Sequence, residues 1–150
     1  MPVSSTHSAI TESDVVLDTN VFVAAAFNPG SHAGRIVNTV RQGRLLLIWN
    51  DATRRETQRI LERIPPISWE PFAVLFHDQG RFLGKVNPAW FGHVRDPADR
   101  VFGALAYAAG ATLITQDDDL LSVRSNVSVP IVTPAEFVDV RLRTREDLLR

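Results

Sequence analysis

The chain has 150 residues, 45% of them hydrophobic and 22% charged, with a formal net charge of −1. These values predict one globular domain with a sizeable core, and they argue against a protein that binds DNA through a strong overall positive field. Because the chain has no cysteine, disulfides, thiolate zinc sites and a cysteine nucleophile are excluded. Any metal must then have oxygen or imidazole ligands, which favours magnesium or manganese.

The two ends of the chain predict tails around a single domain. Residues 1–13 lack the charged and apolar regions of a signal peptide, and we expect them to form a flexible N-terminal tail. We expect one domain over residues 14–140 and a charged tail over residues 141–150. No run reaches the roughly 18 apolar residues of a membrane span, so we expect a cytoplasmic protein with no membrane partner.

The first half of the chain alternates predicted strands and helices. A β-branched run over residues 15–18 ends in Asp18 and predicts a buried strand that leads directly into a helix. Further elements are predicted in this order: a helix over 21–27, a helix capped by Ser31 and ending near Gly43, a strand over 45–49, a helix from Asn50 or Asp51 to Arg63, and a helix from about Ser68 towards Gly80.

The second half continues the alternation after an irregular segment over residues 80–94, which has room for one short strand. The predicted elements are a helix from Asp96 to Gly110, a strand over 112–115, a strand over 129–132, a capping box over 133–136 and a helical, charged end. Alternating strands and helices favour right-handed βαβ units, and therefore an α/β fold with a parallel sheet between layers of helices.

Two acids in the first half have both a structural and a functional interpretation. Asp18 lies at a strand tip, where ligands bind in open α/β sheets, but it could equally cap the next helix. Glu56 shares a helical face with Ala52, Ile60 and Ile64, and a glutamate in an apolar stripe needs a positive partner. The alternative places Glu56 at the rim of that stripe, paired with Arg59 or Arg63.

The acids of the second half are equally open to two interpretations. Asp96 and Asp99 suit the start of a helix, yet Asp99 lies on a helix that is apolar nearly all round. Asp117 and Asp119 follow Thr115 just past a strand, and one acid of this cluster is expected to cap the next turn. Successive acids repel one another unless they are solvated or bind a cation.

The four candidate positions converge on one edge of a parallel sheet, because they follow strand ends or begin helices. A cluster of carboxylates at that edge predicts a site for one or two magnesium or manganese ions, suited to phosphotransfer or phosphodiester hydrolysis. A haloacid-dehalogenase-type phosphatase is a weaker alternative, since Asn20 stands where its second aspartate is required.

Three segments and an isolated glutamate resemble the PIN domain, with the nearest likeness to bacterial toxins of the VapC type. The segments read VVLDTNVFVAA, DPADRVFGALAYAAGATLITQDDDLL and IVTPAEF, and the resemblance extends from Val15 to Phe137. It implies a three-layer α/β/α domain with a central parallel sheet of about four to five strands. It also implies a magnesium- or manganese-dependent endoribonuclease that cleaves RNA with a cation-activated water, often forms a homodimer and is often neutralised by a small antitoxin protein.

The resemblance also assigns roles to individual residues. The four catalytic and metal-binding acids fall on Asp18, Glu56, Asp99 and Asp117. Asn20 and Thr115 support the site, and Asp119 is an alternative to Asp117. The helix around Glu56 is more basic than the family pattern, and residues 67–94 match it weakly.

Basic side chains near the acids suggest contacts with RNA phosphates. The candidates are Arg54, Arg55, Arg59 and Arg100; for any single one, a solvated helix face is the alternative. Trp69 and Phe72 are expected to be exposed and to offer a dimer face. A PIN-like module that binds RNA or protein without catalysis is the second functional hypothesis.

Overall fold

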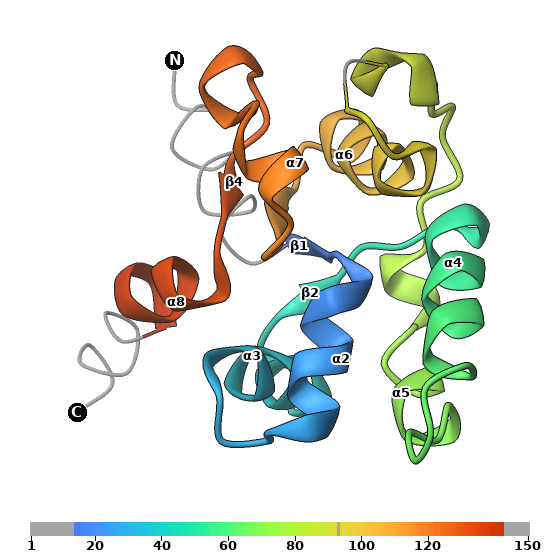
Figure 1. Cartoon of the computed structure of the whole chain (residues 1–150), viewed down its shortest axis with the longest axis vertical. Helices are drawn as coiled ribbons and strands as arrows, with labels where there is room; N and C mark the ends of the chain where they lie inside the picture. The colour runs from blue at the N-terminus through green and yellow to red at the C-terminus, as the bar shows by residue number, and fades with distance from the viewer. Residues whose placement is uncertain (1–13, 93, 143–150) are drawn as a thin grey trace.

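Four parallel strands form the centre of the computed structural model, which describes residues 14–92 and 94–142 (Figure 1). The strands are β1 (Asp14–Leu17), β2 (Leu46–Leu47), β3 (Thr112–Ile114) and β4 (Ile131–Val132), in the order β2-β1-β3-β4. β1 and β3 lie side by side, with Leu17 paired to Ile114. The predicted α/β fold with a parallel sheet is therefore confirmed, although β2 and β4 are shorter than the apolar runs that predicted them.

Side chains of the central strands alternate between two separate cores. Val15 and Leu17 belong to one core and Val16 to the other, and all three are at most 2% exposed. A strand covered on both faces is apolar on both, which explains the continuous apolar run Val15-Val16-Leu17 before Asp18. The sheet is thus the middle layer of three.

Helices supply the outer layers, and Figure 1 shows α2 and α3 below the sheet and α6 above it. The first core takes buried side chains from α2 (Thr19–Phe27), α3 (His32–Arg41), α4 (Asp51–Leu61), α5 (Glu70–Ala73) and α8 (Pro134–Phe137). The second core takes them from α6 (Pro97–Ala109), α7 (Asp118–Leu121) and the short η2 (Pro88–Phe91). The remaining turns are η1 (Asp78–Gly80), η3 (Arg124–Asn126) and η4 (Val138–Leu142).

Most helix starts follow the predicted capping residues. Ser31 accepts a hydrogen bond from the Gly34 amide, Asn50 caps α4, and Asp96 accepts from the Ala98 amide. The capping box that begins at Thr133 is also present. These signals are local, and the structure confirms them.

The predicted helix from Ser68 to Gly80 is wrong, because α5 has only four residues. The chain instead turns so that residues 80–82 can run beside the end of β2. The Trp49 amide donates to the Gly80 carbonyl at 3.0 Å, and the Phe82 amide donates to the Trp49 carbonyl at 2.7 Å. A Cβ on Gly80 would lie 1.9 Å from the Leu47 carbonyl oxygen, so only glycine fits at this approach.

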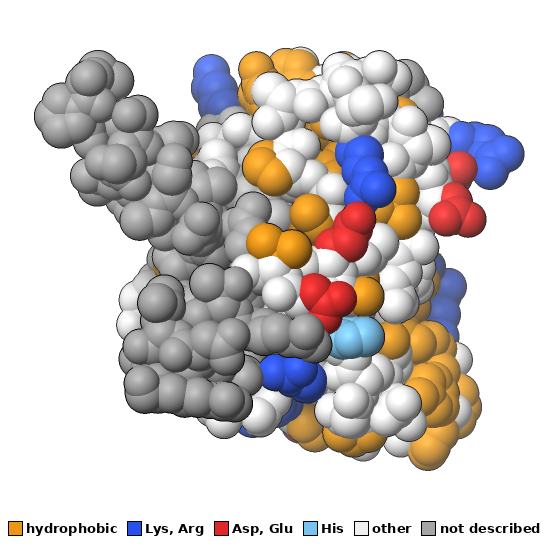
Figure 2. Space-filling model, turned by 90° about the vertical axis from the view of Figure 1, so that its left-hand side faces the viewer, with side chains coloured by type: hydrophobic (Ala, Val, Ile, Leu, Met, Phe, Trp, Pro, Cys, Tyr) orange, Lys and Arg blue, Asp and Glu red, His pale blue; other side chains and the backbone are white. Residues whose placement is uncertain are grey.

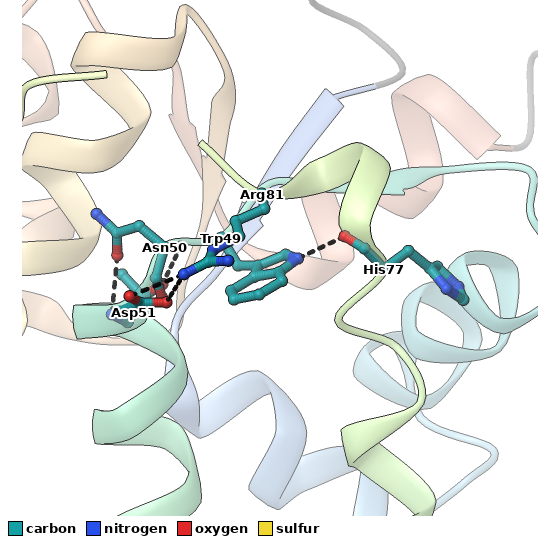
Figure 3. A network of polar contacts seen from close by, with 6 residues as sticks. Trp49, Asn50, Asp51, His77 and Arg81 are labelled. Atoms are coloured by element: carbon teal, nitrogen blue, oxygen red, sulfur yellow. Dashed lines mark hydrogen bonds and ion pairs between the residues drawn. The ribbon is translucent and has the colours of Figure 1, made fainter. Parts of the chain in front are cut away.

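Side chains reinforce this edge of the sheet, as Figure 3 shows. The Trp49 indole N–H donates to the His77 carbonyl at 2.8 Å. The Arg81 guanidinium lies 5.6 Å from the centre of the Trp49 ring and 2.9 Å from the Asp51 carboxylate. Arg81 therefore ties the strand-like segment to the first turn of α4.

The predicted dimer face is also wrong, because Trp69 and Phe72 are only 9% and 8% exposed. Both rings belong to an aromatic cluster with Phe22 and Phe76, at centroid distances of 5.6 to 5.9 Å. Their apolar area is needed within the first core and is not available to a second protein.

Two further predictions concern the tails of the chain and the absence of a membrane-spanning segment. Residues 1–13 and 143–150, which hold most of the predicted tails, lie outside the described residues. Among residues 14–92 and 94–142, no helix has the length and apolar character needed to cross a bilayer.

Candidate active site at the carboxyl edge of the sheet

Asp18 and Thr115 meet where β1 and β3 end side by side. The Asp18 amide donates to the Ile114 carbonyl at 3.1 Å, and the Thr115 hydroxyl donates to Asp18 Oδ2 at 2.7 Å. The Asp117 amide in turn donates to the same hydroxyl oxygen at 2.9 Å. Thr115 thus holds one carboxylate directly and positions the backbone of the next acid.

The Asp18 carboxyl is 2% exposed and makes no capping hydrogen bond to α2. Burial raises its pKa from the ordinary value of 3.8 to about 6. Hydrogen bonds from the Thr115 hydroxyl and the Thr19 backbone lower the pKa in part, while the Asp117 and Glu56 carboxylates raise it further. The Asp18 side chain is therefore not the side-chain cap of α2. No basic side chain among the described residues forms an ion pair with it.

Asp99 and Asp117 form a carboxyl pair beside Asp18. Asp96, not Asp99, caps α6, which leaves the half-buried Asp99 side chain to hydrogen-bond with Asp117. Burial, this bond and repulsion from Asp117 and Asp18 raise the pKa of Asp99 to about 8. The raised pKa of Asp99 marks a position where a further negative charge is unfavourable.

The α4 helix brings Glu56 to the same place, but not through the face that the sequence predicted. The expected stripe of Ala52, Ile60 and Ile64 is wrong, since none of these three is buried. The buried residues of α4 are Thr53, Thr57 and Leu61. Thr57 fixes this orientation through a buried hydrogen bond of 3.0 Å between its hydroxyl and that of Thr19 on α2.

Glu56 lies beside this buried face, with its side chain 19% exposed. It pairs with Arg59, whose Nε donates to Glu56 Oε1 at 3.2 Å and whose Nη2 donates to Oε2 at 2.8 Å. The alternative prediction, a rim position with an arginine one turn away, is the arrangement observed.

These side chains enclose a cavity of about 320 Å³. Five of its lining residues are acids and one is a base. The acids are Asp18, Glu56, Asp96, Asp99 and Asp117, and the base is Arg59. Asn20 also lines the cavity, so the structure gathers all four predicted acids and one predicted supporting residue.

Asp119 lies beside this cavity and does not line it. Its carboxylate accepts a hydrogen bond from Arg95 at 3.1 Å, and its amide donates to Asp117 Oδ1 at 2.8 Å. Single carboxylate oxygens of Asp99, Asp117 and Asp119 lie within 4.8 Å of one another. Asp117 is therefore the more central of the two alternatives, with Asp119 within reach of the same ion.

The donor set fits a hard divalent cation. All candidate ligands are carboxylate oxygens, which magnesium and manganese prefer. Asp18 is buried and forms no ion pair among the described residues, and burial together with nearby carboxylates raises the pKa of Asp99. A divalent cation would compensate the buried charge of Asp18 and reduce the repulsion between the carboxylates, so the residues present suit such an ion.

The four predicted RNA-binding arginines have different surroundings. Arg54 lies over the Trp69 and Phe76 rings, 5.3 and 5.8 Å from their centres, and Arg55 is exposed. Arg100 donates to the backbone carbonyl of Val94 at 2.6 Å. Arg59 alone among the four lines the cavity.

Figure 2 shows the face on the left of Figure 1, where the coloured basic side chains are scattered and some lie directly beside acidic ones. A continuous basic path for a phosphate backbone is absent from the part of this face that is drawn in colour.

Sequence reasoning missed three features of the site. Asp96 was assigned only to capping, yet it also lines the cavity. The Thr19–Thr57 bond that orients α4 left no signal, because two threonines far apart in sequence predict no contact. The pairing of Arg95 with Asp119 was equally hidden, since it joins the loop before α6 to α7.

Comparison with known proteins adds a family to this geometry. The PIN domain family matches residues 14–119. The chain is also 27% identical over 151 aligned residues to the uncharacterized protein MJ1680 of Methanocaldococcus jannaschii, an alignment that covers 83% of this chain and 89% of that protein. No solved structure matches the chain significantly.

Proposed function

The chain belongs to the PIN-domain family, and we propose that it is a magnesium- or manganese-dependent endoribonuclease. PIN domains are generally metal-dependent nucleases. One observation carries the proposal for this chain: Asp18, Asp99 and Asp117 converge on a single cavity in which two of them have strongly raised pKa values. Clustered carboxylates with such pKa values are typical of sites built to hold a cation.

The cavity acids Asp18, Glu56, Asp99 and Asp117 would hold the ion. When bound, a divalent cation in such a site lowers the pKa of water for in-line attack on a phosphodiester and neutralises developing charge. Asp99 and Asp117 would offer one carboxylate oxygen each to such an ion, since their oxygens lie within 4.8 Å of each other. Thr115 keeps Asp18 in one orientation, and Asn20 lines the same cavity.

The central test compares two acids of the cavity with one acid outside it. Asp18→Asn and Asp99→Asn should abolish cleavage of single-stranded RNA in manganese, with unchanged far-UV circular dichroism. Asp51→Asn is the matched control, because Asp51 is exposed and pairs with Arg81 away from the cavity. Full activity in both cavity variants would refute the proposal, and metal-independent RNA binding without cleavage would instead indicate a binding module.

We propose further that the protein acts in the cytoplasm as the toxin of a toxin–antitoxin pair, as the motif resemblance suggests. Induced expression of the native chain should then arrest growth of a bacterial host, whereas the Asp18→Asn chain should not. Co-expression with a small protein encoded next to the gene should restore growth. A homodimer, the other expectation from the resemblance, is tested by light scattering of the purified chain.

A further inference from the structure

Arg59 is the one basic side chain that lines the acidic cavity in the described part of the chain. Two hydrogen bonds from Nε and Nη2 to the Glu56 carboxylate hold its guanidinium there. The side chain is 43% exposed, so the guanidinium is also open to solvent. Two of its five N–H groups serve Glu56, which leaves the N–H groups of Nη1 and one of Nη2 for another acceptor.

The cavity presents an electrostatic problem for any substrate that carries phosphate. Five carboxylates surround it, and a phosphodiester adds a further negative charge to the same small volume. A guanidinium matches phosphate oxygens in two-point geometry and keeps its charge at every working pH. Arg59 is therefore the side chain of this cavity best suited to receive the anion.

The pairing with Glu56 restricts when Arg59 can do so. The guanidinium contacts both Glu56 oxygens, so the same oxygens cannot fully serve a cation while the pair is intact. We propose that Arg59 is a substrate-positioning residue that exchanges partners: it neutralises Glu56 in the free protein and binds the RNA phosphate at the cleavage site once Glu56 turns to the cation. This inference rests on the proposed nuclease function.

The exchange of partners predicts opposite effects of losing Arg59: manganese should bind more tightly, and RNA cleavage should be slower. Arg59→Ala frees Glu56, so manganese should bind about two- to fivefold more tightly, as expected for removal of a competing exposed ion pair. The same change removes a charge-assisted hydrogen bond to phosphate, so kcat should fall about 10- to 100-fold. A simple helix-stabilising pair at i,i+3 spacing predicts neither effect.

The experiment measures manganese affinity by calorimetry without RNA, and kcat and KM for a single-stranded RNA, on the full chain. Arg59→Lys should keep part of the kcat, since lysine supplies the charge without the two-point geometry. Arg44→Ala is the control for net charge, because Arg44 is exposed and precedes β2, at the amino ends of the strands, whereas the cavity lies at their carboxyl ends. Circular dichroism checks that each variant folds, and Arg59→Lys carries the test if Arg59→Ala does not.

Tighter manganese binding together with a lower kcat would support the exchange. Cleavage by Arg59→Ala at the rate of the native chain, or weaker manganese binding, would overturn it and leave the nuclease proposal intact. Absence of metal-dependent cleavage by the native chain would instead refute the nuclease proposal and the exchange with it.

Discussion

The metal-free protein should lose stability as the pH rises above about 4, because Asp18 is buried. Replacing Asp18 with asparagine should remove most of this loss. Burial holds the pKa of Asp18 at about 6 in the folded chain, against 3.8 as its ordinary value. Between these values the unfolded chain releases the proton and the folded chain keeps it, so stability falls as pH rises through this window. At 1.36 kcal/mol per pH unit the total loss is about 3 kcal/mol, of which about 2 kcal/mol falls between pH 4.5 and 7.5.

Urea unfolding followed by circular dichroism in EDTA measures this loss directly. The native chain should lose about 2 kcal/mol more than Asp18→Asn between pH 4.5 and 7.5, equivalent to about 4–8 °C in Tm. Any cost of burying the amide is the same at each pH and cancels from the comparison. Burial, the largest cause of the raised pKa of Asp99, acts in both proteins, and the smaller contribution of Asp18 to that pKa is lost in Asp18→Asn, which widens the difference in the same direction. Parallel stability curves for the two chains would refute the account of Asp18 as a buried carboxylate without a counter-ion.

Two further pairs of substitutions test the residues that support the site and the sheet. Thr115→Val should weaken manganese binding about 10-fold, since Asp18 loses the hydroxyl that orients it, whereas Thr115→Ser should bind nearly as well as the native chain in the same titration. Gly80→Ala should lower the free energy of unfolding by about 3 kcal/mol, because its Cβ meets the Leu47 carbonyl oxygen. Gly30→Ala, where a Cβ meets nothing closer than 3.5 Å, should change it by less than about 0.5 kcal/mol, and an equal effect of both glycine changes in urea unfolding would contradict this reasoning.

The parts of the fold that could be predicted depend on local chemistry. Ser31, Asp96 and Thr133 bond to amides two or three residues ahead, so a short window of sequence contains the whole signal. The prediction of a long helix after Ser68 was wrong because a contact with a distant part of the chain ends the helix early. Gly80 must approach the backbone of β2, and no sequence pattern near residue 68 predicts that contact.

The acids of the site could be predicted for a different reason. The alternation of strands and helices places Asp18 and Asp117 beyond the carboxyl ends of two parallel strands, and it brings helix starts to the same edge. The orientation of Glu56 could not be decided in this way, because an apolar stripe and an arginine pair both fit helical spacing. The buried contact between Thr19 and Thr57 settles the orientation, and it depends on how two helices pack.

The hydrogen bond between Thr115 and Asp18 joins residues 97 positions apart, and the four acids predicted as ligands divide evenly between the two halves of the chain. Asp18 and Glu56 come before the exposed Leu83, and Asp99 and Asp117 come after it. A chain cleaved at Leu83 would yield two fragments, neither of which holds Asp18 together with Asp99 and Asp117. Regained nuclease activity on mixing would therefore report that β1 and β3 have paired across the break, and during synthesis no active centre can form before β3 has been made.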